Sequence, residues 1–157
     1  MKVARVTLSD RASAGVYEDR SGPEIERILG ELIPGEHEWV VRVMPDERKD
    51  LEVLLRELCD GACVDLVVTT GGTGPSARDI TPEATRAVIE RELPGFGEAM
   101  RMRSFERVPT AILSRSTAGT RGRTLIVNLP GNPKAIGECL PMLVPAIREA
   151  IRHLNGE

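Results

Sequence analysis

Apolar residues recur along the chain in short runs and in longer stretches with helical spacing. The short runs are rich in valine, isoleucine and leucine, and they predict strands over residues 3–8, 39–44, 66–70, 111–114 and 124–128. The longer stretches place apolar residues on one helical face, and they predict helices over residues 21–32, 46–58, 82–92, 96–105 and 133–151. This alternation predicts an α/β fold of three layers, with helices on both faces of a mostly parallel sheet. Ligands of such folds bind beyond the carboxyl ends of the strands.

Polar residues mark the expected helix starts. Four predicted helices have a residue suited to an N-cap, namely Ser21, Asp46, Thr81 and Asn132. Glu24 completes a capping-box pattern in the first, and a proline follows the cap in the last two. For Asp46 the local sequence favours the cap, and a catalytic role is the alternative. Pro141 and Pro145 each remove a backbone hydrogen bond from the last helix, so we expect a kink or restart near residue 141.

The most informative stretch covers residues 67–84, where a buried strand leads into a glycine-rich turn and then a helix. Gly71, Gly72 and Gly74 allow positive φ and close approach to a ligand, so their amides can form an anion-binding nest. Asp79 lies where an anion would bind, and its negative charge would repel that anion unless a cation binds with them. Mg²⁺ suits this role because it binds few carboxylates and completes its shell with phosphate oxygens and water. The alternative is a tight turn with a solvated Asp79.

Other segments add to this picture. The glycine turn lacks the ending of a P-loop and the continuation of a dinucleotide fingerprint, so it predicts a different kind of anion site. Residues 129–134 repeat the order of strand, glycine turn and helix start, which predicts a second anion-binding end. The first strand ends near Ser9, and the small and polar residues 12–20 that follow are typical of a loop.

Composition limits the classes of function. The 157 residues fit a single domain over residues 1–157, and with 41% hydrophobic and 3% aromatic residues the expected core is aliphatic. A net charge of −3 and a pI of about 5.6 give no overall positive field for nucleic acid or an anionic membrane. Only two histidines are present, so the sequence disfavours a Ser/His/Asp triad and a histidine metal site. Carboxylates, hydroxyls, amides and cations must carry the chemistry.

Cysteine usage and the start of the chain bear on the compartment. Cys59, Cys63 and Cys139 are odd in number and lack the usual zinc spacing, so we expect small buried residues in a reducing compartment. The chain opens directly into a strand pattern without a signal region, and no apolar run approaches the length that spans a membrane. These features predict a cytoplasmic protein.

Several long motifs together resemble one family. The stretches SDRASAGVYEDRSG, TTGGTGPSARDITPEAT, PGFGEAMR, LSRSTAGTRG and NLPGNPKAIGECL, in this order, are similar to the molybdopterin adenylyltransferases of molybdenum-cofactor synthesis, including bacterial MogA-type proteins and the related plant and gephyrin G domains. The resemblance spans nearly the whole chain. It implies an α/β fold, usually trimeric, that binds molybdopterin and MgATP. It also implies transfer of AMP from ATP to the terminal phosphate of molybdopterin, with release of pyrophosphate.

The resemblance also assigns residues, motif by motif. Asp79 in ARDITPE and Asp46 in MPDE match acidic residues that the family uses around magnesium and the reacting phosphates, which makes them the expected catalytic and metal-binding residues. The expected substrate-binding residues are Ser9, Asp10, Ser13, Gly71, Gly72, Thr73, Gly74, Ser114, Asn128, Pro130, Gly131 and Lys134. Arg78 and Lys134 are expected to supply fixed positive charge.

This chemistry does not need a histidine. A phosphate that attacks another phosphate is already ionised near neutral pH, so alignment and charge neutralisation matter more than a base. A family member that binds the pterin without adenylylating it is the main alternative. A nucleotide pyrophosphatase like the competence-damage-inducible proteins is a third, and the ARDITPE pattern disfavours it. Some family members also carry a carboxyl-terminal extension beyond the position of Leu154, and we expect no contact from such a segment here.

Overall fold

Four neighbouring parallel strands, from one edge inward, form most of a six-stranded sheet. The computed structural model describes residues 1–157, and its strands are β1 (Lys2–Leu8), β2 (Glu38–Met44), β3 (Leu66–Thr70), β4 (Arg91–Glu92), β5 (Ala118–Arg121) and β6 (Thr124–Leu129). Their order across the sheet is β2-β1-β3-β6-β5-β4. The pairs β1–β2, β1–β3 and β3–β6 are parallel, whereas β5 pairs antiparallel with β6 and β4. The carboxyl ends of β1, β2, β3 and β6 therefore meet at one edge.

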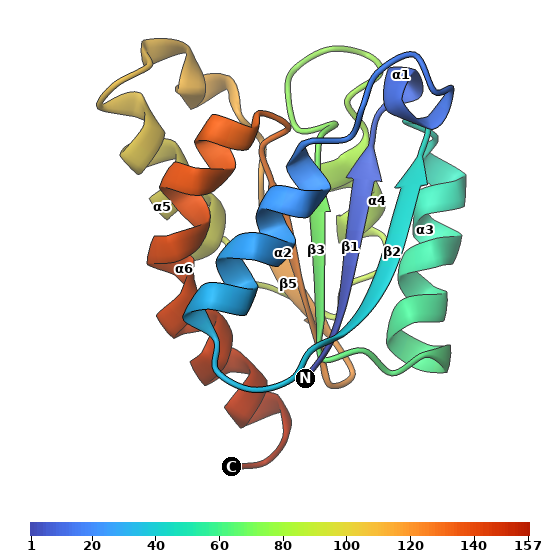
Figure 1. The fold of residues 1–157 in the computed structure, drawn as a ribbon, viewed down its shortest axis with the longest axis vertical. Coiled ribbons are helices and arrows are strands. Elements are labelled where there is room, and N and C mark those ends of the chain that lie inside the picture. The colour runs from blue at the N-terminus through green and yellow to red at the C-terminus, as the bar shows by residue number, and fades with distance from the viewer.

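Helices cover both faces of the sheet. They are α1 (Asp10–Ser13), α2 (Ser21–Leu32), α3 (Arg48–Arg56), α4 (Thr81–Arg86), α5 (Gly95–Phe105) and α6 (Pro133–Leu154), with a π-helical turn η1 (Glu57–Gly61) and a 3-10 helix η2 (Pro109–Leu113). One hydrophobic cluster packs α2, α5 and α6 on one face, and a second packs α3 and α4 on the other. Figure 1 shows α2 and α6 in front of the sheet and α4 behind it. The predicted three-layer α/β fold is confirmed.

Two predicted elements differ from the structure. The strand expected over residues 111–114 is wrong, because these residues form the end of η2 and the start of a loop, where Ile112 and Leu113 are exposed. The strand before β6 is instead β5, which forms a hairpin with β6 through a turn at Gly122. The helix expected over residues 82–92 ends at Arg86, since the backbone beyond it turns into the sheet and pairs with β5.

Only one of the four predicted N-caps is confirmed. Asn132 accepts a hydrogen bond from the amide of Lys134 at 2.9 Å. The N-cap roles predicted for three residues are wrong, and these are Ser21, Asp46 and Thr81. In α2 the side chain of Asp19 accepts from the amide of Gly22, which leaves the Ser21 hydroxyl free to donate elsewhere. Asp46 and Thr81 are also engaged elsewhere, because both contact loops at the carboxyl edge of the sheet.

The last helix passes through both of its internal prolines. A restart near residue 141 is wrong, because α6 continues from Pro133 to Leu154 with Pro141 and Pro145 inside it. Proline costs roughly 3 kcal/mol in a helix interior. The buried face of α6 opposes that cost, because six of its residues pack against the sheet and neighbouring helices, namely Ile136, Cys139, Leu140, Leu143, Val144 and Ile147.

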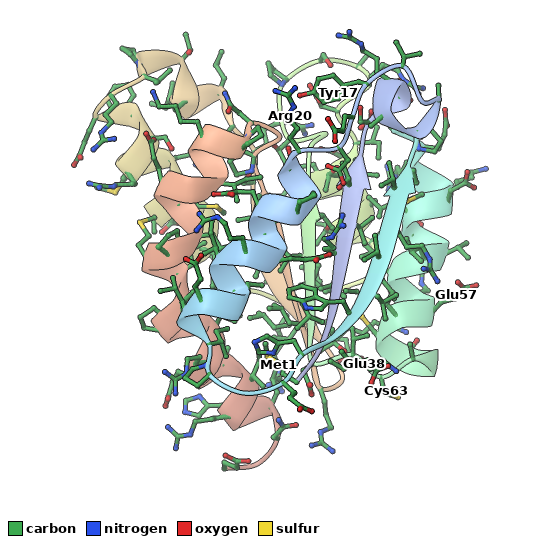
Figure 2. All side chains as sticks on the ribbon, viewed as in Figure 1. Met1, Tyr17, Arg20, Glu38, Glu57 and Cys63 are labelled. Carbon is green, nitrogen blue, oxygen red and sulfur yellow. The ribbon has the colours of Figure 1, made fainter.

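The three cysteines lie in different environments. Cys59 and Cys139 are buried as expected, and burial raises the pKa of the Cys59 thiol to about 11. The expected burial of Cys63 is wrong, because this residue is exposed with a φ of +49° at the end of the sheet opposite the carboxyl edge (Figure 2). None of the helices combines the length and apolar character that crossing a membrane requires.

Candidate functional site

The two glycine turns predicted from the sequence lie side by side at the carboxyl edge of the sheet. This follows from the parallel pairing of β3 with β6, the strands that lead into them. The hydroxyl of Thr70 donates to the carbonyl oxygen of Pro130 at 2.8 Å, and the amide of Gly71 donates to that of Leu129 at 3.4 Å. A Cβ built on Gly131 would lie 3.3 Å from the Cα of Gly71. Both turns therefore face a single site.

The first turn depends on glycine for two different reasons. Gly71 and Gly72 have φ values of +93° and +63°, which confirms the predicted backbone. A Cβ on Gly71 would also lie 2.3 Å from the carbonyl oxygen of Leu8. Gly74 does not have the predicted positive φ, and its lack of a side chain matters because a Cβ would lie 2.8 Å from an oxygen of Asp79. Glycine at this position thus makes room for a carboxylate.

Both turns present backbone amides that donate a hydrogen bond to no group of the protein. The N–H groups of Gly72, Thr73 and Gly74 make no hydrogen bond within the protein, and neither do those of Gly131 and Asn132. The amide of Gly71 does not join them, because it donates to β6. Successive free amides at a turn form a concave site for anions, so each turn can hold phosphate oxygens.

Asp46 lies beside the first turn and is fixed by Asp10. Its Oδ2 accepts from the amide of Asp10 at 3.2 Å, and the amide of Asp46 donates to Oδ1 of Asp10 at 3.0 Å. This reciprocal pair ties the end of β2 to the end of β1. Burial raises the pKa of the Asp46 carboxyl, and the negative charges of Asp10 and Asp79 act in the same direction. Oδ1 of Asp46 accepts no hydrogen bond and lies 2.9 Å from the Cβ position of Gly72.

Asp79 lies on the other side of the same turn. Its Oδ2 accepts from the amide of Ser76 at 3.0 Å and from the Ser76 hydroxyl at 2.7 Å, whereas its Oδ1 accepts no hydrogen bond. No group of three or more acidic, histidine or cysteine side chains is arranged around a metal position. Asp46 and Asp79 thus offer one unbonded oxygen each. This donor set fits Mg²⁺, which is bound through one or two carboxylates together with substrate phosphates and water.

The two cations expected to face substrate differ in their availability. Arg78 donates to both carboxylate oxygens of Asp10, at 3.0 and 2.7 Å, and to Glu47 at 3.1 Å. These hydrogen bonds hold the pKa of Asp10 below its usual value and occupy the guanidinium of Arg78. Lys134 makes no ion pair or side-chain hydrogen bond, and it lines a cavity. Lys134 is therefore the freer of the two charges.

That cavity lies beside the second glycine turn and is larger than a second one beside the first strand. It has a volume of about 340 Å³, and its polar lining includes Arg101, Arg107, Ser114, Asn132, Lys134 and Glu138. Ser114 and Lys134 were expected from the sequence, whereas the two arginines of the α5 region were not. Pro130 contributes an apolar wall. The cavity thus joins cationic side chains to the second glycine turn.

The smaller cavity lies between the first strand and the loop over residues 12–20. Its volume is about 190 Å³, and its lining includes Ser9, Tyr17, Asp19, Thr70, Gly71 and Gly131. Asp19 accepts from Arg5 at 3.1 Å and from Thr7 at 2.9 Å, which anchors the loop (Figure 2 shows Tyr17 and Arg20 on it, beyond the strand ends). Ser9 caps α1 by accepting from the amide of Ala12. Ser13 lies outside the lining, because its hydroxyl donates to Asp10 on the exposed face of α1.

Two predicted substrate residues lie behind the site instead of on its surface. Asn128 is 0% exposed, and its Nδ2 donates to the hydroxyls of Thr69 at 3.0 Å and Thr85 at 2.9 Å. Thr73 is also buried, and its carbonyl oxygen accepts from the amide of Arg115. The side chain of Asn128 therefore links β3, β6 and α4 beneath the turn.

Arg115 was not predicted from the sequence, and it holds the loop that carries Asp79. Its guanidinium donates to the carbonyl oxygens of Gly74 and Asp79, both at 2.8 Å, and it forms an ion pair with Glu83. The only sequence signal was its position directly after Ser114 in the LSR stretch. Its partners lie 32 to 41 residues away, so no local pattern reveals them.

Comparison with known proteins identifies the family of this chain. A family model described as a probable molybdopterin binding domain matches residues 4–149. A protein of Helicobacter pylori named molybdopterin adenylyltransferase is 56% identical over 151 residues, which cover 96% of this chain and 86% of the relative. The protein of the same name from Escherichia coli K12 is 47% identical over 153 residues, covering 98% and 78%.

Similarity to solved structures supports the same family. The crystal structure of the molybdopterin biosynthesis enzyme MoaB from Thermus thermophilus superposes with a TM-score of 0.89 at 39% identity, covering 99% of this chain and 97% of that one. Sequence and fold thus agree along nearly the whole length. The chain belongs to the family of MogA-type molybdopterin-binding proteins that act in molybdenum cofactor biosynthesis.

Proposed function

We propose that this protein is a molybdopterin adenylyltransferase that uses ATP and Mg²⁺. The similar bacterial proteins carry the name of that activity. The observation that carries the proposal is the placement of Asp46 and Asp79 on either side of one glycine turn, each with an unbonded carboxylate oxygen. Carboxylates beside free amides suit a site where a cation and phosphates bind together.

The reaction is a displacement at phosphorus. A terminal phosphate oxygen of molybdopterin forms a bond to the α-phosphorus of ATP, and the bond from that phosphorus to the pyrophosphate oxygen breaks. Adenylylated molybdopterin and pyrophosphate are the products. The attacking oxygen is ionised near neutral pH, so the protein has to align two anions and neutralise their charge.

The residues around the turns divide these tasks. The amides of Gly72, Thr73 and Gly74 hold oxygens of one phosphate group, and those of Gly131 and Asn132, with Lys134 beside them, hold another. Asp46 and Asp79 hold Mg²⁺, which when bound neutralises phosphate charge and supports the in-line arrangement. The hydrogen bonds of Asp10 to Asp46 and of Ser76 to Asp79 fix both carboxylates before substrate arrives.

We also propose that the protein is a homotrimer, as the family resemblance implies. An apolar patch on α5 and the segment after it supports self-association, because five large apolar side chains there are exposed, namely Met102, Phe105, Val108, Ile112 and Leu113. Light scattering should give a trimer mass, and Met102→Glu should lower it because Met102 is 72% exposed within the patch. Val53→Glu is the control, since Val53 is similarly exposed but lies on α3. A monomer mass for the wild type at micromolar concentration would contradict the proposal.

The cytoplasmic location of the protein stays a prediction.

The activity is tested with molybdopterin and MgATP, scored by pyrophosphate and adenylylated pterin. We expect product from the wild type, no product with a chelator present, and recovery when Mg²⁺ is restored. Asp79→Asn should fold normally and lose roughly 100-fold or more in turnover, because a group that organises transition-state charge is removed. Asp50→Asn on the exposed start of α3 is the matched control. Full activity under chelation would refute the metal role, and pterin binding without product in Mg²⁺ would favour the non-adenylylating alternative.

A further inference from the structure

We propose that Arg115 is a positioning residue, which holds residues 74–79 in the conformation that presents the Asp79 carboxylate to the glycine turn. This inference rests on the proposed role of Asp79. It adds a residue from a distant part of the chain that need not touch substrate. It also predicts how the loss of that residue differs from the loss of a direct phosphate ligand.

The contacts of Arg115 bracket this loop at both ends. Its backbone amide donates to the carbonyl oxygen of Thr73 at 2.8 Å, just before the loop begins. Nε donates to the carbonyl oxygen of Gly74, and Nη2 donates to that of Asp79, each at 2.8 Å. One planar side chain thus fixes the separation of the first and last residues of the loop. A lysine cannot reproduce this fork, because its donors diverge from a single nitrogen.

The loop has little else to hold it in place. Residues 75–78 are exposed, and the only backbone hydrogen bond within the loop runs from the amide of Asp79 to the carbonyl oxygen of Ser76. Ser76 also donates twice to the Asp79 carboxylate, but Ser76 itself belongs to the loop and moves with it. Arg78 ties the loop to Asp10 and Glu47 through exposed ion pairs, which stabilise weakly. Arg115 is the less exposed anchor of the two arginines.

Glu83 completes this arrangement and argues against direct phosphate binding by Arg115. The guanidinium donates to both carboxylate oxygens of Glu83 on α4. Burial raises the pKa of Glu83, but the hydrogen bond and charge of Arg115, together with a backbone hydrogen bond and the charge of Arg86, leave the pKa below its usual value. Four of the five N–H groups of Arg115 are thus engaged by Gly74, Asp79 and Glu83. One N–H group is left, so a phosphate would find most of the donors of this guanidinium already occupied.

The test compares Arg115→Lys with the wild type, Asp79→Asn, Glu83→Gln and a control. Arg86→Lys is the matched control, because Arg86 lies on the same helix as Glu83 and pairs with Glu92 away from the loop. Hydrogen exchange of residues 76–80 reports the order of the loop without substrate, since Pro75 has no amide hydrogen. Binding of Mn²⁺ in the presence of a non-hydrolysable ATP analogue, measured by electron paramagnetic resonance, reports the carboxylate site. Steady-state kinetics with MgATP and molybdopterin give kcat and KM separately.

We expect Arg115→Lys to speed exchange in the loop about tenfold or more, because each lost hydrogen bond involved a charged donor. Its Mn²⁺ affinity and kcat should each fall by about tenfold or more, while KM for molybdopterin changes by less than about threefold. Glu83→Gln should shift the same quantities less, because it frees the guanidinium without removing it. Arg86→Lys should match the wild type in all of them.

Two results would overturn the proposal. One is loop exchange in Arg115→Lys equal to that of the wild type. The other is a rise in KM for ATP with unchanged kcat and Mn²⁺ affinity, which would make Arg115 a direct phosphate ligand. A failure of the proposed function looks different, because the wild type would then give no product. A failure of the role of Asp79 would leave Asp79→Asn with wild-type turnover and Mn²⁺ affinity, whatever Arg115→Lys does to the loop.

Discussion

Replacing Gly71 by alanine should damage the site more than any other single methyl group added to its turns. The φ of Gly71 is +93°, and a Cβ there would lie 2.3 Å from the carbonyl oxygen of Leu8. That oxygen belongs to β1 and cannot rotate away, so the backbone has to shift. Gly71 also donates to Leu129 and accepts from the hydroxyl of Thr81, and the shift therefore reaches β6 and α4.

The expected loss of stability has two parts. A left-handed backbone costs an alanine about 1–2 kcal/mol, and overpacking against fixed neighbours costs about 1–3 kcal/mol. The total of about 2–5 kcal/mol is less than the stability of many domains, so Gly71→Ala should remain folded under native conditions. Its adenylyl transfer should fall sharply, because the amides of the turn move relative to Asp46 and Asp79.

Two other glycines provide controls that separate these parts. Gly122 has a φ of +53° but nothing within 4 Å of its Cβ position, so Gly122→Ala should cost only about 1–2 kcal/mol. Gly30 lies on the exposed side of α2 with no neighbour within 4 Å, and Gly30→Ala should stabilise by about 0.5–1 kcal/mol. Urea unfolding followed by circular dichroism gives all three values. A cost for Gly71→Ala no larger than that for Gly122→Ala would refute the steric argument.

Three further predictions concern single residues. Burial raises the pKa of Asp46 in the folded state, so ionisation of this carboxyl opposes folding. Asp46→Asn should therefore raise the urea midpoint at pH 7. The gain should vanish below about pH 3, where the carboxyl is protonated in both the folded and the unfolded state. Asn128→Asp should cost several kcal/mol at pH 7 and less in acid, since it places an ionisable group at a position with no exposure; equal urea midpoints for mutant and wild type at both pH values would contradict the buried placement. Pro145→Ala should stabilise by about 1–3 kcal/mol in thermal unfolding, because Pro145 lies exposed inside a continuous helix.

The parallel core could be predicted because its strands are locally distinct. Val67 and Val68, for example, belong to an apolar run that is buried on both faces of the sheet. Such runs can be recognised as strands without knowledge of the strands they pair with. The strand over Ala118–Arg121 contains no such run. It becomes a strand because it pairs with β6 across a tight turn. The apolar residues 111–113 that precede it have the more strand-like sequence, although they form the end of η2.

The site could be predicted where a motif is contiguous and not where it depends on contacts between distant residues. Asp79 follows the glycine turn within a few residues, so its proximity to that turn is fixed by the chain itself. The local sequence around Asp46 favours a helix cap, and only the family resemblance assigned it to the site. Its place beside the turn depends on contacts with Gly72 and with Asp10, 36 residues earlier. Arg115 could be noticed only through its position next to Ser114, because an arginine that binds carbonyl oxygens has no sequence pattern of its own.

The strand order carries a consequence for how the protein matures during synthesis. β3 lies between β1 and β6, and residues 66–70 pair with residues 125–129. One edge of β3 therefore stays unpaired until more than four fifths of the chain has left the ribosome. A strand that is fully buried in the folded protein but has an open edge during synthesis can associate with other chains. The interval between synthesis of β3 and synthesis of β6 is accordingly the period in which the nascent chain has most need of a chaperone.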